Sequence, residues 1–180
     1  RFLDDKIYMN LKNKKKDTNL SKIFTLKLID SKLFTKVEII NSELDQNTIG
    51  GNILFKLNKN IITGIFDYGD DQIIFKDANL RNNFLDGKFD GVVKFLPYFN
   101  FNLNVDLNSL NFNRLYDFLV HLEDKNKKSL FKVDKKINGQ LNLSVDKIFS
   151  RRTLIHSFES RIKFTNGNIL IDQLLLNLGK

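Results

Sequence analysis

The segment from Pro97 to Asn108 alternates apolar and polar side chains without a fault. Because successive side chains of a β-strand point to opposite faces, this pattern predicts an antiparallel-type strand with one apolar and one polar face. A buried parallel strand would be apolar throughout. The apolar face must be covered either by more protein or by a bound apolar partner. Its residues are Phe99, Phe101, Leu103, Val105 and Leu107.

Further strands are expected along most of the chain. Short runs rich in β-forming residues span 6–12, 21–29 and 33–40. Several glycines are followed by apolar residues at the second and fourth positions, which indicates one hairpin-and-strand unit used repeatedly without a fixed period. These alternating sets are Ile53, Phe55 and Leu57 after Gly50-Gly51, Phe66 and Tyr68 after Gly64, Val93 and Phe95 after Gly91, Leu141, Leu143 and Val145 after Gly139, and Ile169 and Ile171 after Gly167.

Turn chemistry supports these strands. Asn166-Gly167 lies between two apolar runs, 162–164 and 169–171, and Asn-Gly readily supplies the two positive φ values of a type I′ hairpin turn. Asp86-Gly87 and Asp90-Gly91 are weaker candidates for a turn or a bulge, because they fall close together inside one apolar run.

One segment departs from the strand period. Residues 111–123 are expected to form an amphipathic helix, with Asn111 or Ser109 as the cap. Its polar face carries Arg114 against several acidic residues, unlike a membrane-interface helix. The sequence therefore predicts a helix that packs on the apolar sheet face or plugs its end. The apolar positions are Phe112, Leu115, Tyr116, Phe118, Leu119 and Leu122.

Composition fits a single domain over residues 1–180. The chain is 42% hydrophobic and 28% charged, has no cysteine, and begins with Arg1, so we expect a piece of a longer protein. The net charge of +8 concentrates in Lys12–Lys16 and Lys125–Lys136, which are expected to be loops between strands. These loops could attract anionic phosphates. Nucleic-acid modules place aromatic side chains among their basic residues, whereas here the two are segregated, so no nucleic-acid binding is expected.

No catalytic residue, metal site or cofactor is predicted. His121 and His156 are far apart in sequence and match no metal-ligand spacing. Asp67, Asp70 and Asp71 gather around a glycine, but they lack the residue order of a calcium loop. A polar hairpin turn is the better interpretation of these aspartates.

Residues 135–180 carry a resemblance. They read K-K-I-N-G-Q-L-N-L-S-V-D-K-I, then S-F-E-S-R-I-K-F-T-N-G-N-I-L-I-D-Q-L, then L-N-L-G, and D-L-N-S-L-N-F-N-R-L-Y-D-F-L precedes them at 106–119. This alternation of strands and Asn-Gly turns resembles the AsmA-like family of bacterial envelope proteins. The resemblance implies an elongated, curved, mostly antiparallel β-groove in the periplasm. It also implies an inner-membrane anchor outside this chain and a role in moving phospholipid toward the outer membrane.

Two function classes remain beside a lipid groove. The apolar face could be the core of a closed β-sandwich or barrel, acting as a structural or protein-interaction module of an envelope protein. An enzyme or carbohydrate-binding β domain would need a convergent polar pocket, for which the sequence offers no residues. If the groove is correct, its partner is a phospholipid or another acyl-chain lipid. The candidate wall residues are Ile53, Phe55, Leu57, Phe99, Phe101, Leu103, Val105, Leu107, Leu141, Leu143, Val145, Ile162 and Phe164.

Overall fold

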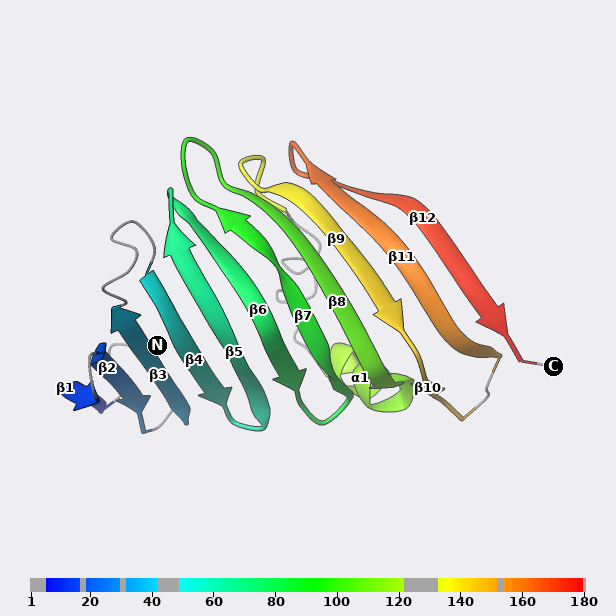
Figure 1. Ribbon diagram of the computed structural model, residues 1–180. Coiled ribbons are helices and arrows are strands. Elements are labelled where there is room, and N and C mark those ends of the chain that lie inside the picture. The colour runs from blue at the N-terminus through cyan, green and yellow to red at the C-terminus, as the bar shows by residue number, and fades with distance from the viewer. Residues whose placement is uncertain are drawn as a thin grey trace.

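The chain folds into one twelve-stranded sheet with one short helix, as seen in a computed structural model (Figure 1). The structure describes residues 6–16, 19–29, 32–41, 49–121, 133–151 and 154–179. The elements are β1 (Ile7–Lys16), β2 (Asn19–Leu28), β3 (Leu33–Asn41), β4 (Ile49–Leu57), β5 (Asn60–Gly69), β6 (Gln72–Arg81), β7 (Leu85–Lys94), β8 (Asn100–Asn111), α1 (Phe112–Val120), β9 (Asn138–Val145), β10 (Ile148–Phe149), β11 (Ile155–Thr165) and β12 (Asn168–Leu178).

The sheet is open. Its strand order is β1-β2-β3-β4-β5-β6-β7-β8-β9-β11-β12, with the short β10 beside β8. The edge strands β1 and β12 lie at opposite ends of the sheet in Figure 1 and do not pair with each other. The predicted mainly β, mostly antiparallel fold with one helix is therefore confirmed. A closed sandwich or barrel is not formed by the residues that the structure describes.

One pair of long neighbours is parallel. β8 pairs antiparallel with β7 but parallel with β9, and β10 also pairs parallel with β8. A parallel pair needs a crossover connection of a dozen or more residues. Residues 112–137, which begin with α1, make this connection. The connection is long enough for β9 to run parallel to β8.

The alternating strand begins later than the sequence pattern indicates. β8 starts at Asn100, and residues 95–99 form the bend that joins it to β7. Pro97 has no N–H to donate to a strand neighbour, which is consistent with a place outside the ladder. The prediction that Pro97 to Phe99 belong to the strand is wrong. Phe99 still lies near it, with its ring centroid 6.3 Å from that of Phe101.

The predicted hairpin turns are confirmed. Asn166 and Gly167 have φ values of 52° and 81° between β11 and β12, as a type I′ turn requires. Asp70 and Asp71 have φ values of 51° and 58° between β5 and β6. The register between β7 and β8 shifts at Asp86-Gly87, where Asn108 on β8 is the unpaired extra residue of the bulge.

Most of the other glycines lie inside strands rather than before them. Gly139 is in β9 and pairs with Phe101 on β8 and with Phe164 on β11. The two rings meet across this glycine with centroids 5.3 Å apart. Of the glycines that precede alternating apolar residues, Gly167 lies in a hairpin turn, whereas Gly139 lies within β9 itself. Here the absence of a side chain makes room for aromatic neighbours.

Replacing Gly139 with Ala is expected to destabilise the fold by about 1–3 kcal/mol, the usual cost of overpacking. The added Cβ would lie 2.6 Å from Cδ1 of Phe101. Gly50→Ala is the matched control, because its Cβ would meet only Oδ1 of Asp67 at 3.4 Å. Urea unfolding followed by circular dichroism measures both. Equal midpoints for the two variants would contradict the packing described for Gly139.

Helix α1 covers one end of the sheet. The side chain of Asn111 accepts a hydrogen bond of 3.0 Å from the backbone N–H of Arg114, so the predicted cap is confirmed. Leu115 packs against the buried cluster of Leu107, Leu110 and Val145. The helix ends at Val120, earlier than predicted; Leu122 and Glu123, and the Leu119 side chain, lie outside the described residues.

The first lysine run is part of a strand and not a loop. Lys12, Lys14 and Lys15 lie in β1, which is paired along its length with β2. Lysines on an edge strand hinder pairing with another chain. The loop prediction for 12–16 is therefore wrong. Of the second run, 125–132 lies outside the described residues.

Candidate functional site

The strand register brings the separate alternating segments to one face of the sheet. Residues that pair directly on neighbouring strands point to the same side. Leu103 on β8 pairs with Gly91 on β7 and with Leu141 on β9, and Leu141 pairs with Ile162 on β11. We call the side of the sheet that carries Leu103 the apolar face, and the opposite side, which carries Asn104, the polar face.

All but one of the candidate wall residues lie in strands on the apolar face. Phe99 is the exception, because it precedes β8. The candidates on β4 are joined to those on β8, β9 and β11 through residues of β5, β6 and β7. Ile53 on β4 pairs with Gly64 on β5, which faces Ala78 on β6. The candidates on this face are Ile53, Phe55, Leu57, Phe101, Leu103, Val105, Leu107, Leu141, Leu143, Val145, Ile162 and Phe164.

One row of neighbouring residues crosses every strand of the main path, and its members pair directly except Gly64 and Ala78, which lie in contact where the β5–β6 register shifts. Adjacent strands lie roughly 4.8 Å apart, so this row extends about 50 Å along the sheet. We call it the central row. Its only hydrogen-bonding side chain is that of Ser160, which is buried. The central row consists of Leu11, Phe24, Val37, Ile53, Gly64, Ala78, Phe89, Val105, Leu143, Ser160 and Leu174.

Little of the apolar face is covered by protein. Apart from α1 at one end, no second layer packs on it within the described ranges (Figure 1). The middle strands carry half-buried side chains, such as those of Phe55 and Leu103. Toward the edge, Ile171 is 65% exposed and Leu174 is 50% exposed. The buried apolar side chains of the described chain are Leu28, Ala78, Leu107, Leu110 and Val145.

The polar face is held by side-chain hydrogen bonds. Asn142 Nδ2 donates to Asn104 Oδ1 at 2.8 Å, and Asn104 Nδ2 donates to Asp90 Oδ1 at 2.8 Å. Ser144 Oγ donates to Asp106 Oδ1 at 2.6 Å on the same strand pair. These bonds link β7, β8 and β9 side by side. On these three strands the polar side chains therefore bond to one another on the polar face.

Several wall residues escaped prediction from the sequence. The alternation of Phe24, Leu26 and Leu28 on β2 is visible in the sequence and indicates which of its residues share a face. In β6, consecutive apolar residues at 73–75 hide the period of two. Phe75 was recognisable only from its partners, since its ring centroid lies 5.4 Å from that of Phe89.

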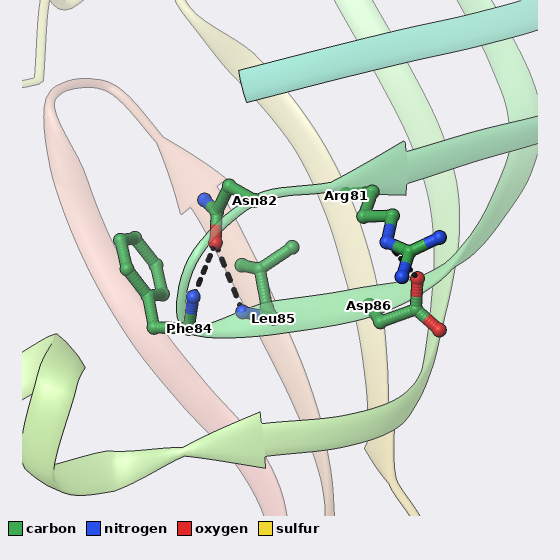
Figure 2. A network of polar contacts seen from close by, with 5 residues as sticks. All are labelled: Arg81, Asn82, Phe84, Leu85 and Asp86. Atoms are coloured by element: carbon green, nitrogen blue, oxygen red, sulfur yellow. Dashed lines mark hydrogen bonds and ion pairs between the residues drawn. The ribbon is translucent and has the colours of Figure 1, made fainter. Parts of the chain in front are cut away.

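The turn between β6 and β7 is held by side-chain hydrogen bonds (Figure 2) and also contacts α1. Asn82 Oδ1 accepts hydrogen bonds from the backbone N–H groups of Phe84 and Leu85, at 2.8 and 2.9 Å. The ring of Phe84 then packs on that of Phe118, with centroids 5.5 Å apart. Asn111 at the start of the helix donates its backbone N–H to Phe84 O at 2.6 Å. The turn therefore fixes where the helix lies on the apolar face.

A pocket of about 570 Å³ opens on the other side of α1. Its walls come from Leu110, α1, β10, β11 and residues 150, 151 and 154; seven of the ten lining residues are apolar, and the other three are Asn113, Ser150 and Arg151. We call it the helix pocket. Its lining includes Leu110, Phe112, Leu115, Ile148, Leu154 and Phe158.

The two histidines of the described chain lie on different elements. His121 Nδ1 lies 2.8 Å from the backbone oxygen of Asp117, and His156 is exposed on β11. No group of three or more metal-ligating side chains occurs in the part that the structure describes. Within the described ranges, no helix has the length and hydrophobicity needed to cross a membrane.

Comparisons with family models, curated proteins and solved structures find no match for this chain.

Proposed function

We propose that the apolar face binds the acyl chains of lipids and that the chain is a segment of an AsmA-like protein that transports phospholipid across the bacterial envelope. The observation that carries this proposal is the continuity of the uncovered apolar face across the sheet. Its central row runs from Leu11 to Leu174. The periplasmic location, and the membrane anchor outside this chain, rest on the family resemblance alone.

The size of the face supports a ligand. A row of about 50 Å and a width of several residues give an area on the order of 1,000 Å². Monomeric soluble proteins rarely expose a contiguous apolar patch of more than a few hundred Å². Burying apolar surface contributes about 25 cal/mol per Å², so covering each 100 Å² with an acyl chain stabilises the complex by about 2.5 kcal/mol.

The chemistry of the face also suits movement. Apolar contacts are not directional, so an acyl chain that shifts along the central row exchanges one set of contacts for a similar one. Polar side chains that would hold a lipid at one place are few on this row, where Ser160 is the only hydrogen-bonding side chain. A lipid bound in this way would slide across the strands, along the long direction of the sheet.

A second candidate is a protein-interaction module. Leu170 and Leu175 on the polar face of β12 are 54% and 52% exposed, and Ile171 and Leu174 on its other face are also exposed. An edge strand that is apolar on both sides favours pairing with a partner strand. In this case the apolar face would be covered by protein instead of lipid.

Site-specific photo-crosslinking to a radiolabelled phospholipid tests the proposal. A photoreactive phenylalanine analogue at Phe55 or at Ile162 is expected to form lipid adducts, because both positions lie on the apolar face. The same analogue at Lys56 or Asn102 is the matched control. Each is next to an apolar wall residue in sequence but is exposed on the polar face.

Adducts are read by gel electrophoresis after ultraviolet exposure of the folded protein in phospholipid vesicles. Labelling at Phe55 and Ile162 but not at the control positions supports lipid binding by the apolar face. Equal labelling of both faces, or labelling of neither, contradicts it.

A further inference from the structure

The helix pocket differs from the rest of the apolar face because it is walled on several sides. Phe112 and Leu115 of α1 face Ile148 of β10 and Phe158 of β11 across a volume of about 570 Å³. Small-molecule sites in proteins have volumes of roughly 300–1,000 Å³ and mainly apolar walls. The helix pocket has the dimensions and the mainly apolar lining of such a site.

The pocket is continuous with the apolar face. Phe158 lines the pocket and also pairs with Val145, which pairs in turn with Leu107 on β8. Leu110, another wall residue, belongs to the same buried cluster as Leu107 and Val145. The pocket and the apolar face therefore share one apolar cluster.

One cation lies at this pocket. Arg151 is the only charged residue of its described lining, and no acidic side chain accompanies it there. Its backbone N–H donates to Oδ1 of Asn113 on α1 at 3.3 Å, which fixes the residue beside the helix. The side chain is exposed and forms no ion pair within the described residues. A guanidinium binds carboxylate and phosphate oxygens through two parallel hydrogen bonds.

We infer that the helix pocket binds one acyl chain of a lipid with an anionic head group, and that Arg151 holds the carboxylate or phosphate of that head group. The apolar walls account for binding of the acyl chain, and Arg151, the one cation of the described lining, accounts for binding of the negative charge. The inference deepens the proposed function and rests on it, because the lipid would reach the pocket along the apolar face.

Binding of palmitate and of its neutral methyl ester to the purified chain tests the inference. Arg151→Gln is expected to weaken palmitate binding at least tenfold and to leave methyl palmitate binding unchanged, whereas Arg151→Lys should keep most of the affinity. Lys147→Gln is the matched control. It removes one exposed positive charge close by in sequence from a residue outside the pocket lining and should change neither affinity.

The affinities are measured by isothermal titration, and thermal unfolding checks that each variant is folded. Inorganic phosphate is titrated as a head group without a chain, and it should not displace palmitate at equal concentration. Displacement by phosphate, or equal loss of palmitate binding in Lys147→Gln, overturns the inference.

The failures of the two proposals are distinguishable. Unchanged palmitate affinity in Arg151→Gln, together with phospholipid adducts at Phe55 and Ile162, overturns the pocket and leaves the apolar face as the lipid site. Palmitate binding that depends on Arg151, without adducts on the apolar face, supports the pocket and contradicts the proposed conduit.

Discussion

Replacing Val145 with Asp is expected to abolish cooperative folding of the domain. Val145 is 1% exposed and packs in the buried cluster with Leu107 and Leu110 beneath α1. A carboxylate at this position would be buried without a partner, which costs several kcal/mol. Whole domains are stable by only about 5–15 kcal/mol, so this one change removes a large part of the total. Circular dichroism and urea unfolding measure the loss.

Ile171→Asp is the matched control for this prediction. Ile171 lies on the same apolar face, but it is 65% exposed on the edge strand β12. The free energy of unfolding of this variant is expected to lie within about 0.5 kcal/mol of that of the unsubstituted protein, because substitutions at exposed positions usually change it little. If both variants unfolded to the same degree, the apolar face would be ordinary protein core along its whole width, and the open wall described above would be wrong.

The local elements of this fold could be predicted because their signals are short. A period of two between Phe101 and Leu107 depends only on the geometry of one strand. The Asn166-Gly167 turn depends on two residues and their φ preferences. The helix followed from a change of period and from the cap at Asn111. In each case the residues that decide the structure are neighbours in the chain.

Strand pairing depends on residues far apart in sequence and could not be predicted in the same way. The parallel pairing of β8 with β9 joins Leu103 to Leu141 across the inserted helix. The helix pocket unites Phe112 with Phe158 from opposite sides of the same connection. Neither the pairing of β8 with β9 nor the contact across the pocket produces a periodic pattern in the sequence. The wall residues were therefore predictable as separate stripes, whereas the continuous face and the pocket required the structure.

Whether the apolar face is covered was also beyond the sequence. A strand with one apolar face looks the same whether a second sheet or a ligand covers it. Phe55 and Leu103 would have the same alternating neighbours in a sandwich. The distinction comes from the position of α1, which packs only near Leu107, Leu110 and Val145 and leaves the rest of the face without a protein layer in the described ranges.

A pair of charges on the apolar face is expected to remove bound lipid from the protein. The double variant Leu103→Asp with Leu143→Asp places carboxylates on two adjacent strands, one of them in the central row. An acyl chain over these positions would have to desolvate both carboxylates. We expect the amount of co-purified phospholipid, measured by mass spectrometry of extracts, to fall at least a hundredfold, equivalent to about 2.8 kcal/mol.

The control is Asn100→Asp with Asn102→Asp, which adds the same charge to exposed positions on the polar face of β8. It should keep its lipid and its thermal unfolding curve. Light scattering separates the remaining cases. An unsubstituted protein that purifies without lipid as a dimer, and that the Leu103 and Leu143 substitutions convert to a monomer, would assign the apolar face to a protein partner. If the unsubstituted protein purifies without lipid and the double variant is unfolded, the apolar face is ordinary protein core. If the double variant is folded and monomeric but has lost its lipid, neither a protein partner nor unfolding explains the loss. The only change is then the charge placed where the acyl chain would lie.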